Sequence, residues 1–177
     1  MNIHPVFVHF PIALLTFYAL LEILRFNIIK RIPGILSIKF FLLLIGSIGA
    51  FLALQTGELA EESFNSESVR SLIETHSTIA SITTYVFVIL LIGYIVYMIN
   101  QYRQRKLLSM TVSRLDVLNI LWKVLVNISD FIMRPSVLVI LTILGLVAVT
   151  VTGALGGAIV YGPNIDPFVS FVYKLFF

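Results

Sequence analysis

The chain contains no cysteine, and only 12% of its 177 residues are charged. Without thiols it cannot form disulfides, thiolate-bound zinc or copper sites, iron–sulfur clusters or covalently attached haem. Soluble domains carry roughly 25% charged residues. The low charge, together with 59% hydrophobic residues and a mean hydropathy of +1.02, therefore predicts a membrane protein. The net charge of +3 is small, and its basic residues flank apolar segments instead of forming a stripe, which argues against a nucleic-acid partner.

Four apolar segments are long enough to cross a bilayer, which takes about 20 residues. They are 5–26, 38–59, 78–99 and 135–160. The first segment is not preceded by a basic region or followed by a typical cleavage site, so we expect it to remain as a membrane helix. The sequence predicts an all-α membrane protein, with a single four-transmembrane-helix bundle over residues 1–177.

The basic residues are distributed unevenly among the loops, and this predicts an orientation. The first loop and its flanks hold Arg25, Lys30, Arg31 and Lys39, and the third loop holds Arg103, Arg105, Lys106, Arg114, Lys123 and Arg134. The second loop has Arg70 as its one basic residue, among Glu58, Glu61, Glu62, Glu67 and Glu74. Because Lys and Arg stay on the cytoplasmic side, we expect a multi-pass protein of the cytoplasmic membrane. Both termini and the second loop would face the outside or periplasm.

The third loop includes an apolar stretch, 112–133, that resembles a fifth span. Its polar residues recur at spacings of three and four, which places them on one face of a helix. These residues are Asp116, Asn119, Lys123, Asn127 and Asp130. The pattern favours an amphipathic helix lying in the cytoplasmic interface before the fourth span. The aromatic-rich segment 168–177 would lie outside, as an interfacial anchor or as a docking face for another subunit.

All three histidines, His4, His9 and His76, lie near the predicted outer ends of the first and third spans. Ionisable residues inside spans are energetically unfavourable and usually mark function, so His9, about two turns into the first span, is the most informative. It could also simply bond a neighbouring helix or sit at headgroup depth. Pro11 leaves the carbonyl of Phe7 without its helical donor, which loosens the turn that carries His9.

Small residues form a stripe on two of the other helices. The second span carries Gly46, Ala50, Ala53 and Gly57, and the fourth carries Gly145, Ala148, Gly153, Gly156 and Gly157. Close helix packing is the simple explanation for either stripe alone. However, the histidine-bearing ends of the first and third spans and the small-residue ends of the second and fourth spans lie at the same depth in the membrane. This coincidence favours a cavity.

Imidazoles on facing helices of a bundle can hold a haem, and glycines can give the macrocycle room. We expect His9 and His76 to be the axial ligands of one non-covalent haem b, lined by Gly57, Gly153, Gly156 and Gly157. His4 is about 140° from His9 around the helix and should project away. Three histidines allow one such centre, not two.

A small zinc or copper site is the metal alternative. It would combine His4, His9 and His76 with Glu58 or Glu61, and would need the first helix to unwind at its start. The chain shows no catalytic triad or phosphate-binding loop. We therefore expect an electron-transfer or structural subunit, and not an enzyme that acts on its own.

The motifs HPVFVHFPIAL at 4–14, Thr56-Gly57, His76 with Ala80, and GALGGAIVYG at 153–162 resemble a prokaryotic family of small four-helix membrane proteins known only as a domain of unknown function. The resemblance covers nearly the whole chain. It implies a cytochrome b-like bundle whose relatives are sometimes joined to, or encoded near, Rieske-like redox modules. It also implies haem ligation by His9 and His76, with His4 as a further motif position. The long amphipathic segment before the fourth span departs from the family pattern.

These observations predict a cytochrome b-like membrane subunit with one haem near the outer face. It would exchange electrons with another membrane or periplasmic redox protein, or with a quinone. The alternatives are a non-catalytic anchor or scaffold subunit of a larger complex, and the zinc- or copper-binding protein.

Overall fold

The computed structural model describes residues 4–24, 29, 31–61, 67–107 and 116–177. Within these ranges the chain is helical and contains no strand. Four long helices form the body of the molecule: α1 (His4–Ile23), α3 (Ile35–Glu61), α4 (Glu67–Leu107) and α6 (Pro135–Tyr161). Two shorter helices, α5 (Asp116–Ile132) and α7 (Pro167–Phe176), complete it.

Each long helix contains a segment apolar and long enough to cross a membrane. These segments are Val6–Ile23, Ile35–Ala60, Val69–Gln104 and Pro135–Tyr161. A helix satisfies its backbone hydrogen bonds internally, so long apolar sequences in a bilayer adopt this form. The prediction of an all-α protein with four apolar membrane helices is confirmed.

The four long helices pack in a ring, in which each contacts two neighbours: α1 with α3, α3 with α4, α4 with α6, and α6 with α1. Small residues permit the close approaches. A Cβ added at Gly46 would lie 2.6 Å from Leu15, and one at Gly145 would lie 2.9 Å from Phe87. The buried centre of the ring comprises Leu15, Tyr18, Leu43, Ala50, Phe87, Leu90, Tyr94, Leu138 and Val149, with Ile132 of α5 at one end.

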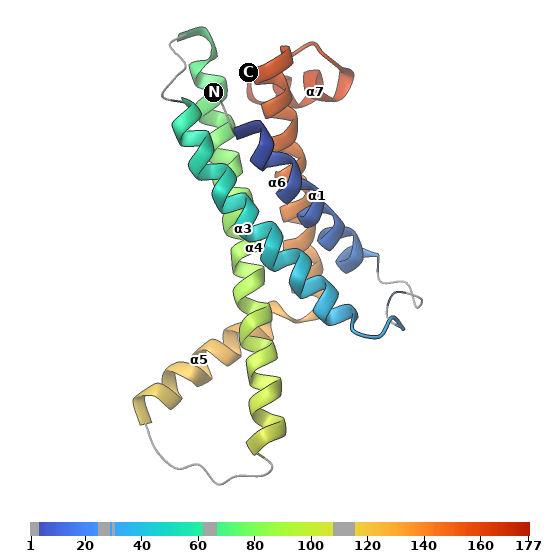
Figure 1. Ribbon diagram of the computed structural model, residues 1–177, viewed down its shortest axis with the longest axis vertical. Helices are drawn as coiled ribbons and strands as arrows, with labels where there is room; N and C mark the ends of the chain where they lie inside the picture. Colours follow the sequence, from blue (N-terminus) through green and yellow to red (C-terminus); the bar gives the residue numbers. More distant parts are fainter. Residues whose placement is uncertain (1–3, 25–28, 30, 62–66, 108–115) are drawn as a thin grey trace.

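The two ends of the bundle differ (Figure 1). The start of α1, the C-terminus and α7 lie at one end, and α5 lies at the other, against α4. We call these the terminal end and the α5 end. α7 begins at Pro167, where the side chain of Asp166 accepts hydrogen bonds from the backbone N–H groups of Phe168 and Val169. Val169 and Val172 then pack against α6 and the start of α4.

Some element boundaries differ from the prediction. α4 has 41 residues and includes the predicted span 78–99 with extra turns at each end. His76, which precedes the predicted span, therefore lies inside the helix. Val69 and Leu72 of the added first turns pack in one cluster with residues of α6 and α7, which stabilises these turns as helix. The aromatic segment after 167 is a helix. Of the predicted amphipathic helix 112–133, residues 112–115 lie outside the described residues.

Candidate functional site

His4, the first residue of α1, lies against the end of α3. Its Nδ1 is 3.1 Å from the hydroxyl of Thr56. That hydroxyl donates its proton to the backbone carbonyls of Leu52 and Ala53, so it accepts a hydrogen bond from His4 Nδ1. Burial lowers the pKa of the His4 imidazole, partly opposed by a hydrogen bond with the backbone of Ala53. The ring is therefore held as a neutral imidazole, the form that can ligate a metal through Nε2.

His76 of α4 is anchored on α6 in the same way. Its Nδ1 lies 3.1 Å from the carbonyl oxygen of Thr152. A carbonyl can only accept, so Nδ1 is the donor and Nε2 of the neutral ring carries the lone pair. Below it, the hydroxyls of Thr83 and Thr152 are 3.1 Å apart and join α4 to α6 again. A ligating histidine commonly gives its other N–H to a carbonyl, which fixes both the tautomer and the ring orientation.

A glycine faces each of these two rings. A Cβ added at Gly57 would lie 3.2 Å from Cε1 of His4, and one at Gly156 would lie 3.2 Å from Cε1 of His76. These distances are tighter than ordinary van der Waals contact. The two helix pairs, α1 with α3 and α4 with α6, thus repeat one arrangement, in which an imidazole of one helix rests on a glycine of the next. These glycines accommodate the imidazoles themselves.

The two imidazoles are near each other at the terminal end of the ring. His4 and His76 are close enough for an electrostatic interaction between them. They come from α1 and α4, two helices that are not neighbours in the ring. The structure therefore places two histidines from non-adjacent helices at the same end of the ring.

His4 and His9 differ in their surroundings. The side chain of His9 is exposed, whereas that of His4, which we expected to project away, points at α3. The buried residues of α1 are Pro11, Leu15, Tyr18, Ala19 and Glu22. Their spacing of three and four, continued backwards, reaches position 4 and passes by position 9.

The remaining predicted residues lie apart from the two rings. A Cβ added at Gly153 would meet no atom of the described chain within 4 Å, and one at Gly157 would meet Val169 of α7 at 3.6 Å. Pro11 is buried in a continuous α1, where a Cβ at Gly49 would lie 3.3 Å from its ring. Thus Gly57 and Gly156 contact the histidines, while Gly153 and Gly157 do not.

The described residues place two imidazole donors at this end, without a third ligand for a small metal ion. Protein zinc sites take three or four protein ligands, and the described residues contain no group of three His, Cys, Asp or Glu side chains that could hold a metal. Glu58 is exposed, and the side chain of Glu61 lies outside the described residues. A haem brings four nitrogens of its own and would need two ligands from the protein, which His4 and His76 would supply.

Sequence reasoning missed a second polar site, in the half of the bundle nearer the α5 end. Glu22 of α1 is only 2% exposed. Its Oε2 accepts hydrogen bonds from Nζ of Lys39, at 2.9 Å, and from the hydroxyl of Tyr94, at 2.8 Å. The cluster joins α1, α3 and α4. An acidic residue inside an apolar span was the available signal, since such residues are expected to be paired.

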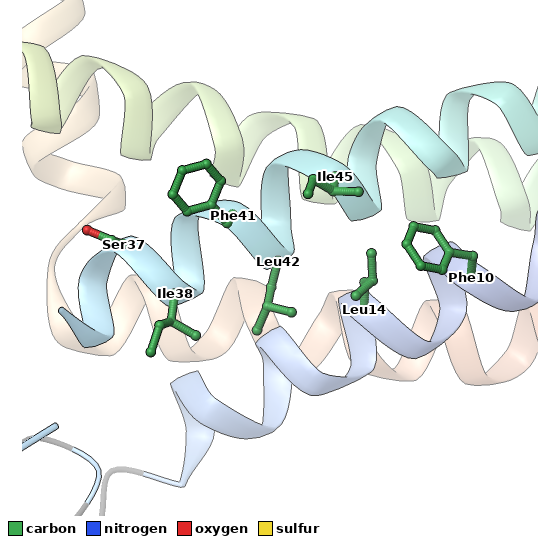
Figure 2. A pocket seen from close by; sticks show the side chains of 7 residues that line it. All are labelled: Phe10, Leu14, Ser37, Ile38, Phe41, Leu42 and Ile45. Carbon is green, nitrogen blue, oxygen red and sulfur yellow. The ribbon is translucent and has the colours of Figure 1, made fainter. Parts of the chain in front are cut away.

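A shallow groove of about 460 Å³ opens between α1 and α3. Figure 2 shows its seven lining residues, of which Ser37 is the one polar member; the others are Phe10, Leu14, Ile38, Phe41, Leu42 and Ile45. None of them is among the residues shown above to hold His4 or His76. An apolar, open groove on a membrane helix pair is suited to lipid chains, and it is separate from the histidine site.

Two glycines one turn apart on α6 provide a matched test of the contact with His76. Alanine is preferred over glycine inside a helix by about 1 kcal/mol, so Gly153→Ala, in open space, should stabilise the protein by up to that amount. Gly156→Ala should lose this gain, because its Cβ would press on the His76 ring. Unfolding by SDS titration from mild detergent, followed by circular dichroism, measures the difference. Equal stabilisation by both would mean that the ring does not rest on Gly156.

No curated protein and no solved structure shows significant similarity to this chain. A family model does match, over residues 1–166, and its description reads "Predicted membrane protein (DUF2231)". The match covers all four long helices and both histidine–glycine contacts. The chain is therefore a multi-pass membrane protein that belongs to the DUF2231 family.

Proposed function

We propose that this protein binds one non-covalent haem b between His4 and His76 and exchanges electrons with an extracytoplasmic redox protein or a quinone. The observation that supports this most is the pair of imidazoles from non-adjacent helices. Each gives its Nδ1–H to the protein and rests its ring edge on a glycine. In this tautomer the Nε2 lone pair of each ring is the one that would ligate the iron. When bound, the haem would supply one-electron redox chemistry.

The protein's own contribution would be to orient the two ligands and to keep water away from them. Thr56 and the carbonyl of Thr152 hold the ring planes, and Gly57 and Gly156 bring the rings close to the backbones of α3 and α6. Leu155, Ala154 and Ala158 of α6 are buried beside this end. A ligand pair fixed by helices in this way needs little rearrangement when the charge of the centre changes.

We propose that the terminal end faces the outside or periplasm. Arg103 near the end of α4, Lys123 on α5 and Arg134 before α6 belong to elements at the α5 end, whereas Arg70 at the start of α4 and Lys174 on α7 belong to the terminal end. The positive-inside rule favours the cytoplasm for the end with more cations. With four spans, both termini share the opposite side. α5 would lie in the cytoplasmic interface, since its exposed apolar and polar side chains occupy different arcs of the helix.

A purified sample tests the haem directly. Protein isolated in mild detergent from haem-replete cells should show a Soret band, and sharp visible bands after reduction, as expected for a six-coordinate b-type haem. Acid acetone should extract the haem, because no cysteine holds it. The sample should contain one haem per chain. A colourless, well-folded protein would contradict the proposal.

An anchor or scaffold role is the second candidate, and one observation favours it. The terminal end presents exposed aromatic side chains on and after α7, at Phe168, Phe171, Phe176 and Phe177. Exposed aromatic clusters are typical of protein interfaces and of membrane-surface anchoring. A folded, colourless protein that co-purifies with a partner would support this role instead.

A further inference from the structure

The α5 end carries a surface on which cations and aromatic rings alternate. We call it the basic surface, and define it by Arg103 near the end of α4, Trp122, Lys123 and Phe131 on α5, and Arg134 before α6. All three cations are exposed. This surface is at the α5 end, whereas the histidines are at the terminal end, and it takes no part in the proposed haem binding.

α5 is fixed to α4 along one edge. The hydroxyl of Ser129 donates to the carbonyl of Gly93, at 2.8 Å, and Ile132 lies 3.0 Å from the position of a Cβ added at Gly93. Ser129 and Ile132 are buried, while Trp122 and Val126 are half-buried. The helix is therefore held at a set angle to the bundle, and its other faces remain exposed.

The exposed faces of α5 separate by polarity. At about 100° per residue, one arc holds large apolar side chains that are at least 45% exposed: Ile120, Leu121, Val124, Leu125, Ile128 and Phe131. The opposite arc holds Asn119, Lys123, Asn127 and Asp130, all exposed. A helix with an apolar arc, a polar arc and cations at its margin suits the boundary between acyl chains and headgroups.

The arginines are stacked on rings instead of being paired with acids. Cζ of Arg103 lies 4.9 Å from the ring centre of Trp122, and Cζ of Arg134 lies 5.4 Å from that of Phe131. Neither arginine, nor Lys123, forms an ion pair within the part of the chain that the structure describes. A guanidinium stacked on a ring keeps its N–H edge available, and that edge matches phosphate geometry.

We propose that the basic surface binds the headgroups of anionic phospholipids in the adjacent leaflet, with Arg103 and Arg134 holding the phosphates and the acyl chains lying along the apolar arc of α5. The charge complementarity identifies the occupant. The polar arc of α5 holds one acid with a described side chain, Asp130, against three cations on the whole surface. Zwitterionic lipid would offer the same chains without the net negative charge.

Trp122 is the only tryptophan in the chain, so its fluorescence reports on this surface alone. The full-length protein is placed in vesicles that contain equal amounts of phosphatidylglycerol and phosphatidylcholine, with brominated chains on one lipid or on the other. Bromine quenches a tryptophan that it touches. Brominated phosphatidylglycerol should quench Trp122 more strongly, with a local enrichment of about fivefold for each contributing cation.

Arg103→Gln and Arg134→Gln should each lower this enrichment about fivefold, and the double variant should leave only the contribution of Lys123, about fivefold. Lys174→Gln, an exposed cation on α7 at the other end, should leave it unchanged. Continued quenching of each variant by brominated phosphatidylcholine verifies that α5 is still in place. Equal quenching of the wild-type protein by both lipids, or quenching by neither, would overturn the proposal.

Discussion

Replacing His76 by alanine should lower the haem content of the purified protein at least about tenfold, since one of two protein ligands would be lost. His4→Ala should have the same effect, because its ring is the one turned towards α3 and near His76. Haem is measured per chain from the spectrum of the acid-acetone extract. Protein is measured independently by amino-acid analysis.

His9→Ala is the control for these two variants, because the His9 side chain is exposed on α1. We expect it to keep most of the haem and the same reduced spectrum. Circular dichroism of all three variants separates loss of haem from loss of fold. If His9→Ala were colourless while His4→Ala kept its spectrum, the pair expected from the sequence would be right, and the pair favoured by the geometry would be wrong.

Lys39→Met should lower the free energy of unfolding by about 3–5 kcal/mol, because it leaves the Glu22 carboxylate buried without its cation. The side chains of Glu22 and Lys39 are 3% and 14% exposed, so water screens the pair little. Tyr94→Phe should lower the free energy of unfolding by a smaller amount, about 1–3 kcal/mol, through loss of one hydrogen bond to the same oxygen. SDS titration from mild detergent gives these values.

The double variant Glu22→Gln, Lys39→Met distinguishes the ion pair from simple packing. Removing both charges should recover most of the stability lost in Lys39→Met, since a neutral pair of similar size has no uncompensated charge to bury. Glu74→Gln provides the exposed comparison. Its partner Arg70 and Glu74 itself are 74% and 59% exposed, so we expect a change below about 0.5 kcal/mol. Additive losses in the double variant would contradict a direct coupling.

The four spans could be predicted because the bilayer imposes their length and their apolar composition. The face of α1 that packs inward could not. α1 is apolar on nearly every side, so its periodicity does not distinguish the face of His4 from that of His9. That choice depends on Thr56 and Gly57, which lie more than 50 positions later in the chain and approach only after α1 and α3 pack.

The glycine stripes illustrate the same limit. Their position at the histidine-bearing end was readable from the sequence, but which glycine would contact which ring was not. Gly156 contacts His76 while Gly153, one turn away, faces open space. The Glu22 cluster required knowledge that Lys39 and Tyr94 reach one carboxylate from two other helices. Pairwise contacts of this kind follow from the crossing of helices, which a single sequence does not specify.

α4 is one uninterrupted helix of 41 residues, about 62 Å long at 1.5 Å per residue, roughly twice the hydrocarbon thickness of a bilayer. The same rod carries His76 towards one face of the membrane and Gly93 and Arg103 towards the other. Because the backbone of α4 is continuous, a small rotation of the helix about its own axis would move His76, Gly93 and Arg103 together. Rotation of α4 thus couples the two ends of the bundle. A partner that rotated one end of the helix would shift the residues at the other end.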